Sequence, residues 1–207
     1  MSEVQIFTDT FLKHYSVPVY GRADTLEMLE SRGTLPPAID AIAMDGRRED
    51  VGGFVVESFP TSHDVPCCGY RIRTPDGRKM AIATDLGICT PVVQQALAGN
   101  DLVALEANYD AFSLHGGPYP YYLKERILGI QGHLSNDCAA AFAAQMAACG
   151  TQEIVLAHLS KENNTPVRAL DTMQRALRGA GFDIPVSVAP RAALSGPYRA
   201  EVSICRR

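Results

Sequence analysis

The stretch IVLAHLSKENN, residues 154–164, contains the pattern from which the fold of this chain is inferred. Its first four residues form a short apolar run typical of a buried strand, and a histidine and further polar residues follow directly. An apolar run before His63 and another before Asp85 end in the same way. Ligand sites in layered α/β proteins gather just beyond the carboxyl ends of strands. The pattern therefore predicts that His63, Asp85 and His158 share one site.

Two imidazoles and a carboxylate are a ligand set that suits zinc or manganese. A carboxylate can also bridge two cations held roughly 3.5–4 Å apart, the usual separation in two-metal hydrolases. Taken singly, however, each residue has an ordinary explanation. A histidine after a strand is often a hydrogen-bonded turn residue, and Thr-Asp-x-Gly is common turn chemistry. The repetition favours the metal interpretation without excluding the other.

Length and composition limit the class of protein. The 207 residues suit a single domain, here expected over residues 1–207, and 46% hydrophobic with 20% charged residues is typical of a globular protein. No run approaches the roughly 18 apolar residues of a membrane helix, and no secretory signal is visible, so we expect a cytoplasmic protein. The six cysteines form no C-x-x-C pair, which fits reduced thiols. With a net charge of −4, nucleic-acid binding needs a local basic patch or metal ions.

The remaining sequence predicts a layered α/β domain, because strand runs alternate with helix runs after a section rich in hairpins. Residues 34–48 are expected to be loop, and residues 108–122, rich in Gly, Pro and Tyr, a long functional loop. Pro75-Asp76-Gly77 marks a hairpin. The expected helices are 2–15, 24–31, 91–97, 136–149 and 166–180, and the expected strands are 17–20, 51–60, 70–74, 80–84, 102–107, 154–157 and 186–189.

Gly132-His133-Leu134-Ser135-Asn136 lies directly before one of these helices, with Ser135 or Asn136 as the expected cap. The N–H groups of a helix N-terminus favour a phosphate, and a histidine there can protonate a leaving oxygen. The simpler interpretation is a capped helix start with a surface histidine, and the residues alone favour it.

Several blocks taken in order resemble the YycJ/WalJ branch of the metallo-β-lactamase superfamily. The resemblance runs from about residue 15 to residue 190. The two long blocks around His133 and His158 are its most specific part. The other blocks are His63-Asp64 followed by Cys68-Gly69-Tyr70, Thr84-Asp85-Leu86-Gly87, Leu105-Glu106-Ala107-Asn108-Tyr109-Asp110, Gly117-Pro118-Tyr119-Pro120 and Leu123-Lys124 followed by Arg126-Ile127.

The resemblance implies an αββα sandwich with two divalent metal ions, zinc or manganese, in a cleft. It implies that His63 is a ligand of the first metal, that Asp85 bridges the two and also acts in catalysis, and that His158 is a ligand of the second. His133 is similar to a non-ligand histidine that acts on the phosphate or the leaving group. Because members of the branch are associated with DNA exonuclease activity, the implied reaction is phosphodiester hydrolysis with DNA as substrate.

Other residues in these blocks are candidates for substrate binding. The rings of Tyr119, Tyr121 and Tyr122 are suited to stacking on bases, and Lys124 and Arg126 to meeting backbone phosphates. Packing of the tyrosine rings and solvation of the charges explain the same residues equally well. Asn163 and Asn164 follow His158 closely and either bind substrate or form a turn. The resemblance adds two further candidates, Asn136 and Lys161.

The chain departs from the superfamily in one respect, because it contains no His-x-His-x-Asp-His motif. Its five histidines are His14, His63, His115, His133 and His158. We therefore expect an N-terminally incomplete fold that binds one metal ion or none, and that tends to form homo-oligomers through exposed sheet edges. Three functions stay open: a nucleic-acid phosphodiesterase, a hydrolase of another ester or a lactam, and an inactive fragment or non-catalytic binding module.

Overall fold

The computed structural model describes residues 11–12, 14–191, 193, 196 and 198, and its centre is one seven-stranded sheet. The strands lie in sequence order: β3 (Arg48–Val51), β4 (Phe54–Pro60), β5 (Cys68–Arg73), β6 (Lys79–Ala83), β7 (Leu102–Glu106), β8 (Glu153–Ala157) and β9 (Val186–Val188). Strands β3 to β6 pair antiparallel through hairpins, and β6 to β9 pair parallel through helical crossovers. The carboxyl ends of β6, β7 and β8 therefore meet at one edge.

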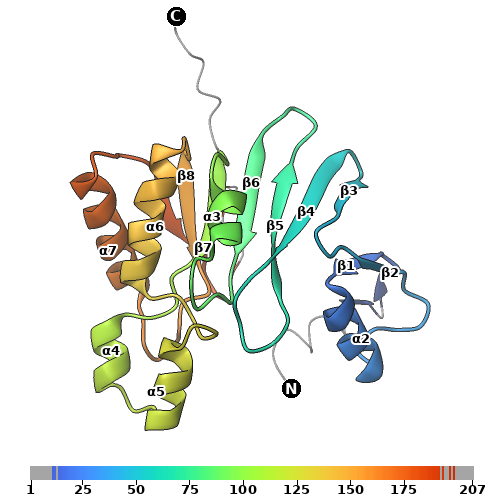
Figure 1. Cartoon of the computed structure of the whole chain (residues 1–207), viewed down its shortest axis with the longest axis horizontal. Coiled ribbons are helices and arrows are strands. Elements are labelled where there is room, and N and C mark those ends of the chain that lie inside the picture. Colours follow the sequence, from blue (N-terminus) through green and yellow to red (C-terminus); the bar gives the residue numbers. More distant parts are fainter. Residues whose placement is uncertain (1–10, 13, 192, 194–195, 197, 199–207) are drawn as a thin grey trace, which may run out of the picture.

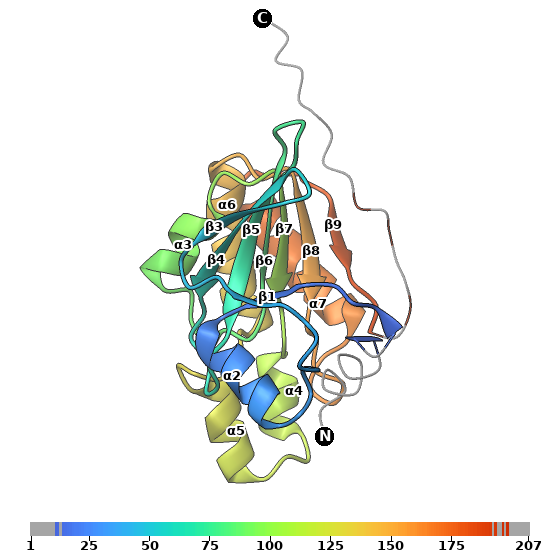
Figure 2. The ribbon, with the colours of Figure 1, turned by 90° about the vertical axis from the view of Figure 1, so that its right-hand side faces the viewer.

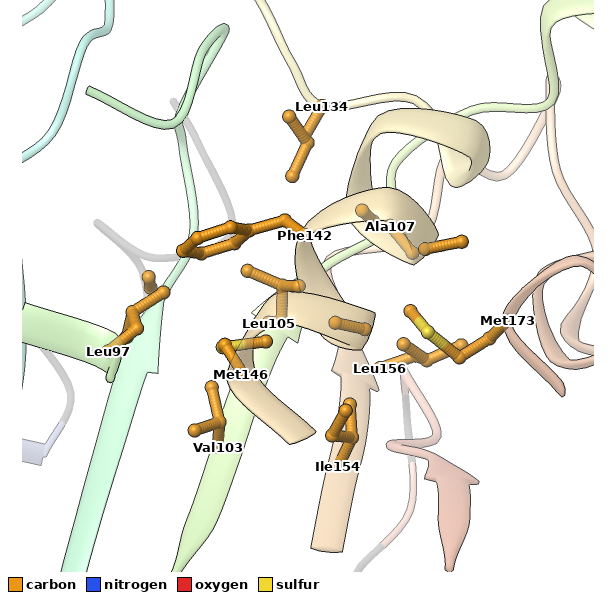
Figure 3. Packing of buried hydrophobic residues seen from close by; sticks show 14 of the residues in the cluster. Leu97, Val103, Leu105, Ala107, Leu134, Phe142, Met146, Ile154, Leu156 and Met173 are labelled. Atoms are coloured by element: carbon orange, nitrogen blue, oxygen red, sulfur yellow. The ribbon is translucent and has the colours of Figure 1, made fainter. Parts of the chain in front are cut away.

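One face of this sheet is covered by three helices, α3 (Pro91–Leu97), α6 (Asn136–Ala148) and α7 (Pro166–Gly179). The alternation along the strands directs Val103 and Leu105 of β7 toward this layer, together with Ile154 and Leu156 of β8. Figure 3 shows these side chains packed against Phe142 and Met146 of α6 and Met173 of α7. This is the main core, and it fixes the strand ends on which the candidate site depends.

Each of the three helices begins at a side-chain cap. Thr90, Ser135 and Thr165 accept hydrogen bonds from the backbone N–H three residues further on, and a proline follows Thr90 and Thr165 at the first helical position. The predicted bounds of all three helices agree with the structure to within one residue. The structure also assigns the cap of α6 to Ser135 rather than Asn136.

The remaining elements lie at the margins of the sheet. A second sheet consists of two parallel strands, β1 (Val19–Gly21) and β2 (Ala41–Ala43), which are connected through α2 (Ala23–Ser31). Helices α4 (Ala111–Gly116) and α5 (Tyr121–Leu128) lie beyond the edge at which β6, β7 and β8 end (Figures 1 and 2). None of the described helices is long and apolar enough to cross a bilayer.

The fold class is confirmed as α/β, with a seven-stranded sheet, its helical layer and a second, two-stranded sheet among the described residues. Three local predictions were wrong. Residues 34–48 are not all loop, because they contain β2, whose three residues are held by pairing with β1. Residues 51–60 are not one strand, because Gly52 and Gly53, with φ of 62° and 85°, turn the chain between β3 and β4. Residues 108–122 contain α4 and the start of α5. The expected helix at 2–15 lies mostly outside the described residues.

Candidate metal centre

The site begins where two strands end in an unusual backbone conformation. Asp85 follows β6 and His158 follows β8, and each has a φ of 56°. They are the two non-glycine residues with positive φ in the part of the chain that the structure describes. This region is sparsely populated by residues with a side chain, and such conformations persist where the surrounding structure enforces them, often at functional sites. Asp85 and His158, both predicted ligands, thus share a left-handed backbone conformation that lowers the stability of the fold.

Glu106, the last residue of β7, connects the two strand ends. Its side chain is fully buried. One carboxylate oxygen, Oε1, accepts hydrogen bonds from Nδ1 of His133 at 2.8 Å and from Nδ1 of His158 at 2.7 Å. The other, Oε2, accepts from the backbone N–H groups of Leu86 at 3.0 Å and Leu134 at 3.3 Å. All four partners are donors, so the surroundings of Glu106 are built for a carboxylate anion.

The charges of this cluster follow from the same contacts. Burial by itself raises the pKa of Glu106, but the hydrogen bonds from His133 and His158 outweigh it, and the pKa lies below its usual value. The hydrogen bond to Glu106 raises the pKa of His158, an effect that desolvation opposes and the nearby Asp85 reinforces. Nδ1 of His133 and Nδ1 of His158 each donate a hydrogen bond to Glu106. In the neutral form of each ring, the free lone pair is therefore on Nε2.

His63 approaches the cluster from the antiparallel side of the sheet, three residues after β4 ends. Its Nδ1 lies 2.9 Å from the carbonyl oxygen of Gly132, which can only accept, so Nδ1 donates and Nε2 keeps its lone pair. That Nε2 lies 3.2 Å from Oδ1 of Asp64 and 3.7 Å from Oδ1 of Asp85, and Nδ1 of His158 lies 3.6 Å from the same oxygen of Asp85. The carboxylate of Asp85 is therefore situated between the two predicted histidine ligands.

The rings of His63, His133 and His158 form one row, with centroids 5.0 Å and 5.2 Å apart. Asp85, Glu106, His133 and His158 each offer an oxygen or nitrogen atom, and these atoms all lie within 4.8 Å of one another. The three histidines and Asp85, predicted from separate stretches of sequence, are thus brought together at one edge of the sheet. Asp85, Glu106, His133 and His158 could hold a metal ion, at the strand ends where ligand sites gather in layered α/β proteins.

Comparisons with known proteins identify the family. Residues 7–159 match the family model described as the beta-lactamase superfamily domain. The chain belongs to this superfamily.

Two relatives and one solved structure illustrate the similarity. The exodeoxyribonuclease YycJ of Bacillus anthracis is 32% identical over 173 residues, which are 83% of this chain and 66% of that protein. The exodeoxyribonuclease WalJ of Streptococcus pneumoniae is 30% identical, covering 84% and 66%. This chain therefore spans just under two thirds of their length. The metallo-beta-lactamase fold protein YhfI of Bacillus subtilis superposes with a TM-score of 0.61 at 20% identity, covering 90% of this chain and 67% of that one.

The asparagines predicted to bind substrate are buried next to the centre. Asn164 donates from Nδ2 to the carbonyl oxygen of Ala107 and to Oδ1 of Asn136, both at 2.8 Å, and Asn136 returns a hydrogen bond to Oδ1 of Asn164 at 3.0 Å. Asn163 is also fully buried. This network joins the end of β7, the start of α6 and the loop after His158. A substrate contact stays a prediction, but the burial favours a role in positioning the loop.

The predicted substrate-binding residues between α4 and the end of α5 make contacts within the protein. Tyr119 packs in a small core with Tyr109, Leu114 and Ile127. Lys124 donates from Nζ to the carbonyl oxygen of His115 at 2.7 Å. Arg126 donates from Nε to Oδ2 of Asp64 at 2.6 Å. Lys161 is exposed. The most exposed rings of the segment belong to Phe112, Tyr121 and Tyr122. The two tyrosines were among the rings predicted to stack on bases, and Phe112 was not predicted.

Glu106 is the functional residue that sequence reasoning missed. It was included in a block of the resemblance but was given no role. The signal was present, because a glutamate closes an otherwise apolar strand that is buried along its length. A carboxylate in such a position requires partners. The identity of those partners, His133 and His158, depends on tertiary structure.

Gly132 provides a test of the loop that carries His133. A Cβ atom at this position would lie 2.1 Å from the carbonyl oxygen of Ile127 and 2.4 Å from that of Arg126, so Gly132→Ala must displace the loop. We expect it to lower stability by about 1–3 kcal/mol and to weaken metal binding, since the Gly132 carbonyl also orients His63. Gly129→Ala is the matched control, because its Cβ contacts are 3.4 Å. Thermal unfolding and metal titration check both variants, and equal behaviour of the two would contradict this account.

Proposed function

We propose that this chain is a metal-dependent phosphodiesterase that acts on nucleic acid, with DNA as the substrate. The observation that carries the proposal is the buried Glu106, which holds His133 and His158 beside Asp85 in an arrangement that offers nitrogen and oxygen donors to a cation. The names of the two exodeoxyribonuclease relatives support nucleic acid as the substrate class.

The donors of this chain fit a divalent ion, zinc or manganese. We assign its ligands to Asp85, His158 and His63, because both rings lie beside the Asp85 carboxylate, with Nε2 of His63 at 3.7 Å and Nδ1 of His158 at 3.6 Å from its Oδ1. Glu106 is the orienting carboxylate rather than a ligand, since both of its oxygens already accept hydrogen bonds. When bound, the ion supplies positive charge that offsets the charge developing on the phosphoryl oxygens during hydrolysis.

His133 is the candidate proton donor to the leaving oxygen. It lies between His63 and His158, its side chain is 20% exposed, and its Nδ1 is anchored on Glu106. The anchored ring presents Nε2 for exchange of a proton with substrate, while the Glu106 carboxylate stabilises the charged imidazolium. The proposed reaction therefore assigns two separate roles: Asp85 binds the cation, and His133 transfers a proton.

Hydrolysis of labelled DNA tests the proposal. The purified chain is incubated with DNA labelled at one end and with Mn²⁺ or Zn²⁺, and release of nucleotides is followed on a gel. We expect metal-dependent release that His133→Gln reduces by about 10²–10⁴-fold without loss of bound metal. A chromogenic lactam serves as the competing substrate. Hydrolysis of the lactam without hydrolysis of DNA would refute the proposal, and so would DNA hydrolysis that is equally fast in the His133→Gln variant.

A further inference from the structure

Asp64, the residue after His63, presents one carboxylate oxygen to the ring of that histidine. Its Oδ1 lies 3.2 Å from Nε2 of His63. Because Nδ1 of His63 donates to the carbonyl oxygen of Gly132, Nε2 of the neutral ring is an acceptor, and an ionised carboxylate oxygen is an acceptor too. Two acceptors at this distance repel each other unless a positive charge lies between them, which is either a proton on Nε2 or a cation bound to both atoms.

The other oxygen of Asp64 is held by α5. Oδ2 accepts a hydrogen bond from Nε of Arg126 at 2.6 Å, and Nη2 of the same guanidinium is ion-paired with it. The side chain of Arg126 is 58% exposed and that of Asp64 is 31% exposed, so the guanidinium holds the carboxylate from the solvent side. This contact leaves Oδ1 of Asp64 free to face His63.

The separation of these two atoms suits ligands of one ion. Two ligand atoms that bind a tetrahedral zinc ion at about 2.0–2.1 Å lie about 3.3 Å from each other. The 3.2 Å between Oδ1 of Asp64 and Nε2 of His63 is close to that value. Oδ1 of Asp85 lies 3.7 Å from the same Nε2. Oxygens of two carboxylates are therefore within reach of a cation that binds the lone pair of His63.

We propose that Asp64 is a further ligand of the divalent ion, in addition to Asp85, His158 and His63. The inference rests on the proposed function, because the ion is the one that the proposed hydrolysis requires. Two carboxylates and two imidazoles then bind the ion, and the two negative charges balance the charge of a divalent cation. Carboxylate oxygens suit manganese, whose octahedral shell is not filled by four protein ligands.

Titration with Mn²⁺ in the absence of nucleic acid tests this ligand. Asp64→Ala is compared with the parent chain and with Arg126→Gln, which removes the ion pair but leaves the Asp64 carboxylate in place. We expect Asp64→Ala to bind Mn²⁺ more than about 10-fold more weakly, since even outer partners of metal ligands contribute about 10–100-fold. Arg126→Gln should change the affinity by less than about 5-fold, the contribution of an exposed ion pair. Alanine is used because the amide of asparagine can donate to Nε2 of His63 and block its lone pair.

Thermal unfolding distinguishes a ligand from a residue with a structural role alone. Mn²⁺ raises the unfolding midpoint of a chain that binds it in the folded state. We expect this rise to be smaller in Asp64→Ala than in the parent and to be kept in Arg126→Gln. If Asp64 acts only by pairing with Arg126, the two variants lose the same Mn²⁺ affinity, and that result would overturn the proposal. Equal affinity of Asp64→Ala and the parent, or a parent that binds no Mn²⁺, would overturn it as well.

Failure of the proposed function gives a different result. Release of nucleotides from labelled DNA is followed with the parent chain and Mn²⁺. A parent that does not hydrolyse DNA, but binds Mn²⁺ more tightly than Asp64→Ala by the expected factor, would refute phosphodiester hydrolysis and leave Asp64 as a ligand. A parent that hydrolyses DNA, with equal Mn²⁺ affinity in Asp64→Ala, would remove Asp64 from the centre and leave the proposed function standing.

Discussion

Replacing Asp85 by asparagine is expected to abolish metal-dependent hydrolysis and to weaken metal binding by more than about 100-fold, since even outer partners of metal ligands contribute 10–100-fold. Asp85 is the carboxylate situated between His63 and His158, at 3.7 Å and 3.6 Å from their ring nitrogens. An amide keeps the shape of the side chain but removes the negative charge that holds the cation. Isothermal titration with Zn²⁺ and Mn²⁺ measures the effect.

Asparagine is chosen because the fold should tolerate it. The φ of 56° at this position disfavours most residues, but asparagine adopts it readily. Loss of metal binding with an unchanged midpoint of thermal unfolding is therefore the expected pair of results. Asp76→Asn, in the β5–β6 hairpin, is the matched control and should leave metal affinity unchanged. Undiminished metal affinity in Asp85→Asn would remove this residue from the centre.

Replacing Glu106 by glutamine is expected to damage stability and metal binding together. The amide oxygen can still accept from the backbone, but the amide N–H₂ group cannot accept from both His133 and His158. We expect a loss of about 1–3 kcal/mol in the free energy of unfolding and a fall of about 10–100-fold in metal affinity. Denaturant unfolding and metal titration check the two effects. A variant as stable as the parent, with unchanged affinity, would show that Glu106 does not organise the histidines.

The same variant carries a pH signature. Because the folded-state pKa of Glu106 lies below its usual value, the residue contributes stability above the pKa of an unfolded glutamate, about 4.3, and that contribution is lost as pH falls through the folded pKa. Glutamine does not titrate. The difference in stability between parent and Glu106→Gln should therefore shrink as the solution is acidified below that value, and a difference that grows on acidification would contradict the assignment.

The sequence predicted those parts of the fold whose signals are local. Pro91 and Pro166 begin two of the predicted helices, and Pro75-Asp76-Gly77 marks a hairpin that pairs β5 with β6 as expected. It missed β2, because a three-residue strand is specified by its partner rather than by its own residues. The helices α4 and α5 were hidden by a composition rich in Gly, Pro and Tyr, although Asp110 caps α4 through Ser113.

In the candidate site, too, the residues with a local signal could be predicted and those defined by tertiary contacts could not. His63, Asp85 and His158 could be predicted because each follows an apolar run, and strands of one sheet bring their ends together. The role of Glu106 could not, because it depends on contacts with residues 27 and 52 positions further along the chain.

We propose that Asp85, His158 and His63 hold one divalent ion, with His158 oriented by Glu106 and His63 by the carbonyl oxygen of Gly132. Elemental analysis of the chain purified without chelators, after dialysis against Zn²⁺ or Mn²⁺, tests it most directly. We expect about one ion per chain, from three protein ligands, and loss of that ion in Asp85→Asn but not in Asp76→Asn. A folded parent chain that retains no metal, or one that retains it equally in the Asp85→Asn variant, would contradict the claim.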